Sequence, residues 1–80
     1  MVARHRTRQH RALQTVLHAM REGGGLTQAE LAGRLGKPQS YVSKYESGER
    51  KLELPELDEI CRALGTNLET LLRRYRKELG

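Results

Sequence analysis

Four polar side chains fall on one face of a helix expected between residues 38 and 47: Gln39, Ser40, Ser43 and Lys44. At about 100° per residue they fill a single arc of that helix. The arc offers an amide, two hydroxyls and an ammonium group, and it contains no carboxylate. These groups can pair with base edges in the major groove of DNA, which is wide enough to admit a helix. The face therefore indicates reading of base sequence, and the alternative is an ordinary solvated helix face.

Residues on either side of this face are suited to contact DNA phosphates. Gln28 falls in the first turn of the preceding predicted helix, where unpaired amides attract anions. Arg50 and Lys51 follow the face at its other end. The alternative for Arg50 is a local ion pair with Glu46 or Glu49, although surface pairs of this kind contribute little stability. Phosphate contacts on both sides would set the reading helix in register.

The helix that precedes this face has a clear start in the sequence. Thr27 and Glu30 have the spacing of a capping box, in which each side chain accepts a hydrogen bond from the other residue's backbone amide. Three apolar residues then share one face: Leu31, Ala32 and Leu35. Gly36 can end the helix because glycine readily adopts a left-handed backbone conformation.

The helix that carries the polar face starts soon afterwards. Pro38 suits its first turn, and Gly48 suits its end. Val42 and Tyr45 form a narrow apolar stripe opposite the polar arc. Two helices joined by so short a link must cross steeply, so residues 27–48 predict a helix-turn-helix.

The rest of the chain predicts further helices within a single domain. Apolar residues at helical spacing occupy residues 13–20, 57–64 and 68–79, with Gly, Pro or Asn at their ends. The composition has no Trp or Phe and only 3 Tyr, which favours helices over strands. The expected fold class is all-α, a compact five-helix domain over residues 12–76. Residues 77–80 are expected to form a tail, and the basic residues 1–11 either a disordered arm or an early helical turn.

The charge distribution favours a polyanionic partner. The net charge is +5, and the excess of positive charge lies in residues 1–45, which hold eight Lys/Arg against two acids, whereas residues 46–80 hold seven against eight. Nucleic acid is the first candidate and an anionic membrane surface the second. The apolar runs are too short for a transmembrane helix or a secretory signal, and one cysteine allows no intramolecular disulfide. We therefore expect a cytoplasmic protein that is associated with the nucleoid when bound to DNA, and no membrane partner.

The sequence predicts no catalytic group, cofactor site or metal site. Ser40 and Ser43 have no neighbouring His or acid to activate a hydroxyl. Three histidines have spacings that match no zinc motif: His5, His10 and His18. Cys61 falls on an apolar stripe, so we expect a buried core residue rather than a reactive thiol. The chain is not expected to be an enzyme.

Two segments, LTQAELAGRLG at 26–36 and PQSYVSKYESGER at 38–50, resemble the helix-turn-helix family of phage-lambda repressor and Cro. This family is also called the xenobiotic-response-element (XRE) family, and the resemblance covers residues 12–73. It implies a lambda-repressor-like five-helix domain that binds operator DNA as a homodimer. It also implies base reading by Gln39, Ser40, Ser43 and Lys44, a phosphate contact at Gln28, and an approach of Ser47 to the DNA backbone. Pro38 stands where many members have a capping Ser or Thr, so a hydroxyl–phosphate contact is missing there.

These patterns together predict a sequence-specific transcriptional regulator, and we expect a repressor, that reads double-stranded operator DNA. The predicted contacts to the DNA backbone are Gln28, Tyr41, Ser47, Arg50 and Lys51. A homodimer would place its reading helices in successive major grooves about 34 Å apart. Its interface could involve Leu52, Leu54, Tyr75 and Leu79, the alternative being a frayed C-terminus. The arginines at positions 4, 6, 8 and 11 either enter the minor groove or belong to a solvated tail.

The alternative function is that of a protein-binding module, such as an antitoxin or a co-regulator. Its main partner would then be another polypeptide of unknown identity. The acidic stretch from Glu56 to Glu59 and the apolar C-terminal residues would carry that contact.

Overall fold

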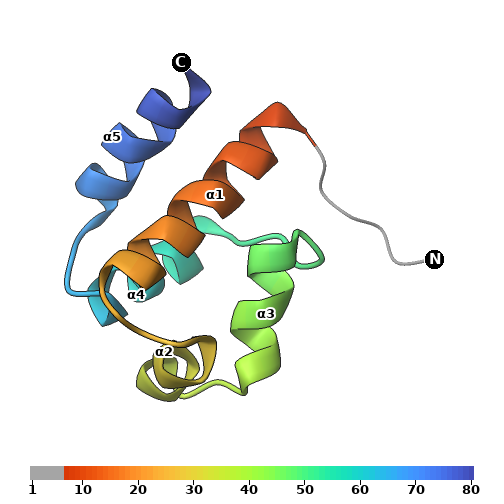
Figure 1. Cartoon of the computed structure of the whole chain (residues 1–80), viewed down its shortest axis with the longest axis vertical. Helices are drawn as coiled ribbons and strands as arrows, with labels where there is room; N and C mark the ends of the chain where they lie inside the picture. Colours follow the sequence, from red (N-terminus) through yellow and green to blue (C-terminus); the bar gives the residue numbers. More distant parts are fainter. Residues whose placement is uncertain (1–6) are drawn as a thin grey trace.

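The computed structural model describes residues 7–80, which form five helices (Figure 1). In chain order they are α1 (Arg8–Gly23), α2 (Gln28–Leu35), α3 (Gln39–Ser47), α4 (Leu54–Ala63) and α5 (Leu68–Leu79). The predicted all-α fold is confirmed. Figure 1 shows α1 running through the middle of the molecule, with α3 on one side of it and α5 on the other. No helix within residues 7–80 is long and apolar enough to cross a membrane.

The first helix begins at Arg8, ahead of the domain boundary expected at residue 12. Thr7 caps it by accepting a hydrogen bond at 3.1 Å from a backbone amide of the first turn. Arg8 and Arg11 therefore lie in a helical turn, one of the two alternatives for the basic segment. The last helix continues to Leu79, so residues 77–79, which were expected in a tail, are helical. The carbonyl oxygen of Leu79 accepts a hydrogen bond from the Arg8 side chain. The arginines at positions 4 and 6 lie outside the described residues.

Side chains from all five helices meet in one apolar core. Its buried members are Val16, Leu17, Met20, Leu31, Ala32, Val42, Tyr45, Ile60, Cys61 and Leu71. Leu35, predicted on the same face of α2 as two of them, is only partly buried at the edge of the core. Cys61 is 0% exposed, and burial raises the pKa of its thiol. The prediction that Cys61 is a core residue is confirmed.

A tight turn joins α2 to α3. Thr27 accepts a hydrogen bond from the amide of Glu30 at 3.1 Å, and Glu30 accepts one from the amide of Thr27 at 2.8 Å. The predicted capping box is confirmed. Gly36 ends α2 with a φ of 66°, a backbone conformation that suits glycine. The placement of Pro38 in the first turn of α3 is wrong, because its ψ of 156° is extended and makes it the residue that precedes the helix.

Candidate nucleic-acid interface

The polar face of α3 points away from the core. The side chains predicted to read bases are all exposed: Gln39, Ser40, Ser43 and Lys44. Within residues 7–80 none of them forms a side-chain hydrogen bond or an ion pair. On the opposite face, Val42 and Tyr45 are 0% and 2% exposed, so the core fixes the orientation of the helix. The structure thus leaves an amide, two hydroxyls and an ammonium group available on one face of a firmly packed helix.

A buried ion pair holds α3 against α1. The guanidinium of Arg21 donates to both carboxylate oxygens of Glu46, from Nε at 2.7 Å and from Nη2 at 3.0 Å. The two side chains are 8% and 5% exposed. Burial alone would raise the pKa of Glu46, but hydrogen bonds from Arg21, His18 and Gln28 outweigh burial and lower that pKa. A two-point contact of this kind has a defined geometry, so it restrains the rotation of α3 relative to α1.

Gln28 reaches the same carboxylate from the start of α2. Its Nε2 donates to Oε1 of Glu46 at 3.1 Å, which ties the first turn of α2 to α3. The amide groups of a first helical turn have no partner within the helix and can still meet a phosphate. The structure therefore gives Gln28 a role in setting the angle between the two helices, and its phosphate contact stays a prediction.

Arg50, Tyr41 and Glu56 form a cluster beside α3. Nη2 of Arg50 donates to Oε2 of Glu56 at 2.6 Å, and the Tyr41 hydroxyl donates to the same oxygen at 3.3 Å. The guanidinium also lies over the Tyr41 ring, 4.9 Å from its centroid. The ion pair considered for Arg50 with Glu46 or Glu49 is wrong, because Glu46 is buried against α1 and the loop after α3 carries Arg50 toward α4.

The two remaining predicted backbone contacts lie at the C-terminal end of α3. The Ser47 hydroxyl donates to the carbonyl oxygen of Lys44 at 3.0 Å, so it is used within the helix end. The same carbonyl oxygen accepts hydrogen bonds from the amides of Glu49 at 2.9 Å and Arg50 at 3.1 Å. This anchoring keeps Arg50 and the following Lys51 next to the end of α3. Lys51 is exposed and forms no ion pair within residues 7–80.

A known protein family accounts for these elements. The model of a helix-turn-helix family matches residues 17–71, which is more than half of the chain. The chain belongs to this helix-turn-helix family. The match takes in α2, α3, α4 and parts of the two outer helices, so it covers the whole candidate interface. A search of curated proteins finds no match.

Solved structures share the fold of this helix-turn-helix chain. An XRE-family like protein from Pseudomonas syringae pv. tomato str. DC3000 is 43% identical, with a TM-score of 0.80 over 86% of this chain and 84% of that one. The clp gene regulator ClgR from Corynebacterium glutamicum is 26% identical, with a TM-score of 0.82 over 91% and 78%. The restriction-modification controller protein C.Esp1396I, solved as a tetramer on its natural 35 base-pair operator, is 23% identical. Its TM-score is 0.85 over 91% and 96%. The resemblance to the XRE family and the lambda-repressor-like fold are confirmed.

Membership of the helix-turn-helix family makes the chain a DNA-binding domain related to transcription regulators. The members of this family are DNA-binding regulators and not enzymes, which agrees with the expectation from the sequence that the chain is not an enzyme. Within residues 7–80, no group of three His, Cys, Asp or Glu side chains is placed to hold a metal ion. His5 lies outside the described residues.

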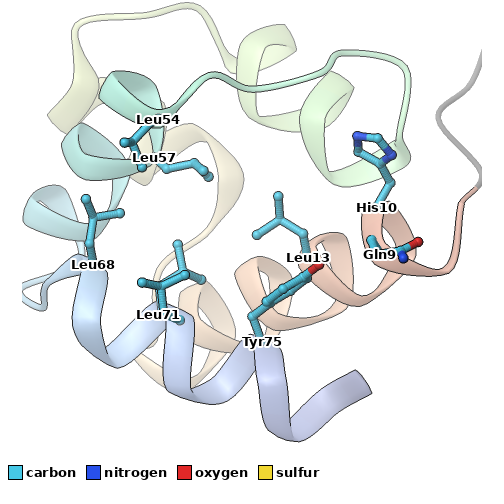
Figure 2. Close-up of a pocket in the computed structure, with 9 residues that line it drawn as sticks. Gln9, His10, Leu13, Leu54, Leu57, Leu68, Leu71 and Tyr75 are labelled. Carbon is cyan, nitrogen blue, oxygen red and sulfur yellow. The ribbon is translucent and has the colours of Figure 1, made fainter. Parts of the chain in front are cut away.

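An apolar groove opens on the side of the helix-turn-helix domain formed by α1, α4 and α5. It has a volume of about 220 Å³. Figure 2 shows the side chains that line it, which include Leu13 from α1, Leu57 from α4 and Tyr75 from α5. Leu54 and Leu72 also line the groove and are 63% and 48% exposed. A groove with large exposed leucines is a surface that a partner could cover.

The residues expected at a dimer interface divide between this groove and the core. Leu54 and Tyr75 line the groove, as does Leu72, which was not predicted. Leu52 instead packs against the core, and Leu79 is partly buried at the end of α5.

Some important residues near the interface were missed by sequence reasoning. Arg21 and Glu46 are 25 residues apart, so no local spacing links them. The signal that was available is the position of Arg21, four residues after Leu17 on the apolar stripe of α1, where a charge needs a partner. Lys37 was missed as well, and its Nζ lies 5.5 Å from the centroid of the Tyr41 ring.

Proposed function

We propose that the chain is a sequence-specific transcription factor that reads operator DNA with α3 and acts as a repressor. The observation that carries this proposal is the exposed polar face of α3, which has no carboxylate and whose groups have no partner within residues 7–80. The amide of Gln39 can form two hydrogen bonds with adenine, and the ammonium group of Lys44 can donate to guanine. Because a bound domain covers its operator, repression is the expected outcome.

The groups that flank α3 support this function by supplying phosphate contacts. The first turn of α2 lies on one side of the face, and Arg50 and Lys51 lie at its C-terminal end. Phosphate contacts fix the register of a protein on DNA without reading sequence, so the bases are left to the α3 side chains.

We infer that the chain binds DNA as a homodimer, with a second copy seated on the apolar groove. Charge complementarity supports this partner: α4 carries Asp58 and Glu59, whereas α5 carries Arg73, Arg74, Arg76 and Lys77. A two-fold axis that sets α4 of one copy beside α5 of the other brings opposite charges together around Leu54 and Leu72. The α3 helices stay uncovered in this arrangement, because α3 and α5 lie on opposite sides of α1 (Figure 1).

Selection of bound duplexes from a random DNA pool tests this function. We expect enrichment of one site made of two inverted half-sites, about one helical turn apart from centre to centre. The enriched duplex should bind at least about 10³-fold more tightly than a scrambled duplex of the same composition. A pool without any enriched sequence would contradict the proposal. Tight binding of a co-purified protein with no DNA affinity would favour the protein-binding alternative.

A further inference from the structure

Glu56 introduces a negative charge into a group of cations beside α3. Its Oε2 accepts hydrogen bonds from Arg50 and from the Tyr41 hydroxyl. Arg50 and Lys37 both lie close to the Tyr41 ring, at 4.9 and 5.5 Å from its centroid. The exposed face of α3 itself has no acid, whereas Glu56 places a carboxylate directly against Arg50 near its end.

The carboxylate of Glu56 is charged at neutral pH. Hydrogen bonds from the amide of Glu53 and from Arg50 lower its pKa, and they outweigh the opposite effect of burial. Its Oε1 completes a capping box at the start of α4 by accepting the hydrogen bond from the Glu53 amide at 2.9 Å. The backbone therefore holds the carboxylate in place, whether or not Arg50 stays paired with it.

Arg50 is suited to exchange partners. Its side chain is 44% exposed, and Glu56 accepts a hydrogen bond from only Nη2 of its guanidinium, which has five N–H donors. A DNA phosphate that approaches Arg50 meets a cation whose charge is already balanced by a fixed neighbour. The phosphate must displace Glu56 or lie beside it, and both outcomes weaken the attraction.

Building on the proposed function, we propose that Glu56 competes with the DNA backbone for Arg50 and limits the affinity of the protein for DNA of any sequence. In the free protein it holds Arg50 against Tyr41. On DNA it opposes the phosphate contact, which is the part of binding that does not depend on sequence. Glu56 is thus a residue that sets the strength of binding without touching a base.

Glu56→Gln tests this role because it removes the charge and keeps an oxygen for the capping box, where Gln is as suitable as Glu. Glu78→Gln on α5 is the matched control, since Glu78 is exposed, lies outside both the α3 face and the apolar groove, and has no partner within residues 7–80. We expect Glu56→Gln to bind the enriched and the scrambled duplex about two- to fivefold more tightly than the control, the range typical of an exposed ion pair. The plot of log K against log salt should be steeper by about 0.9, as for one further phosphate contact.

The same comparison in an Arg50→Ala background shows whether Glu56 acts through Arg50. We expect the difference between Glu56→Gln and Glu78→Gln to disappear there. Equal binding by the two variants in the unaltered background, or a gain that survives Arg50→Ala, would overturn the inference while leaving the proposed function intact. If the unaltered protein bound no duplex, both would be overturned. Thermal unfolding of each variant confirms that the chain remains folded.

Discussion

Lys44 and Arg50 are cations close to the C-terminal end of α3, but their surroundings predict different roles at the residue scale. Lys44 is exposed and has no partner within residues 7–80, so its ammonium group is available to donate a hydrogen bond to a base edge. Arg50 is held by the Glu56 carboxylate and lies over the Tyr41 ring. Arg50 lies beyond the end of α3, where the neighbouring DNA group would be a phosphate rather than a base, and Glu56 limits the strength of that contact.

The ion pair of Arg21 with Glu46 should contribute strongly to the structure that presents these residues. Arg21→Ala leaves a buried carboxylate without its main partner, which should lower the free energy of unfolding by about 3–5 kcal/mol. The double variant Arg21→Met with Glu46→Leu removes both charges and should recover most of that loss. Urea unfolding measures both values. A double variant as unstable as Arg21→Ala would show that the loss does not come from an unpaired charge.

The same pair predicts how stability depends on pH. Because the folded state lowers the pKa of Glu46, the ion pair stabilises the fold above the ordinary glutamate value of 4.5 and is lost as the pH falls below it. The free energy of unfolding should therefore decline from about pH 5 toward pH 3. The decline should be smaller in the double variant, which still has the lowered pKa values of Glu30 and Glu56. Equal slopes for the two proteins would contradict this role of Glu46.

At the scale of the elements, substitution by alanine should change the stability of the fold in opposite directions at two glycines of the helix-turn-helix. Gly33 lies inside α2 with nothing within 4 Å of an added Cβ, so Gly33→Ala should stabilise the fold by about 0.4–1 kcal/mol. Gly48 ends α3 with a φ of 86°, and an added Cβ would lie 2.6 Å from Nε2 of Gln14. Gly48→Ala should destabilise it by about 1–3 kcal/mol. Thermal unfolding compares the two, and equal shifts would contradict the assigned helix end.

The sequence predicted the helices because their signals come from residues close together in the chain, but it did not predict the side-chain contacts between helices. Thr27 and Glu30 are three residues apart, so the capping box could be recognised in the sequence. The polar face of α3 follows from helical periodicity in the same way. The partner of Arg50 depends on the path of the loop between α3 and α4, and that path depends on how α4 packs. Sequence reasoning therefore identified the elements and the exposed face, but the two acids that it offered as alternative partners of Arg50 were not the one that the structure shows.

At the scale of the whole molecule, the candidate DNA surface and the apolar groove face different sides of the fold. α3 carries the polar face on one side of α1, while α5, which lines the groove together with α1 and α4, lies on the other side (Figures 1 and 2). One surface can therefore bind DNA while the other is covered by a second copy. This separation is what a two-fold symmetric reader of inverted half-sites requires.

Charges placed in the groove should separate the two copies. Leu72→Glu introduces a carboxylate at a position that is 48% exposed, so the monomer should still fold. Sedimentation should show a dimer for the unaltered protein and a monomer for Leu72→Glu. Thr15→Glu, on the exposed side of α1, is the control of equal charge and should remain dimeric. A monomeric unaltered protein, or a dimeric Leu72→Glu variant, would contradict the groove as the interface.

The central claim is that α3 reads bases, and it is tested most directly by substituting every base pair of the selected half-site. Binding to each duplex is measured for the unaltered protein, for Gln39→Ala and Lys44→Ala, and for Lys51→Ala as a control from the predicted backbone contacts. Each lost base contact should remove about 1–3 kcal/mol of discrimination at one position and leave the preferences elsewhere unchanged. Lys51→Ala should weaken binding to all duplexes equally. A uniform loss for Gln39→Ala and Lys44→Ala, matching that of Lys51→Ala, would contradict the claim.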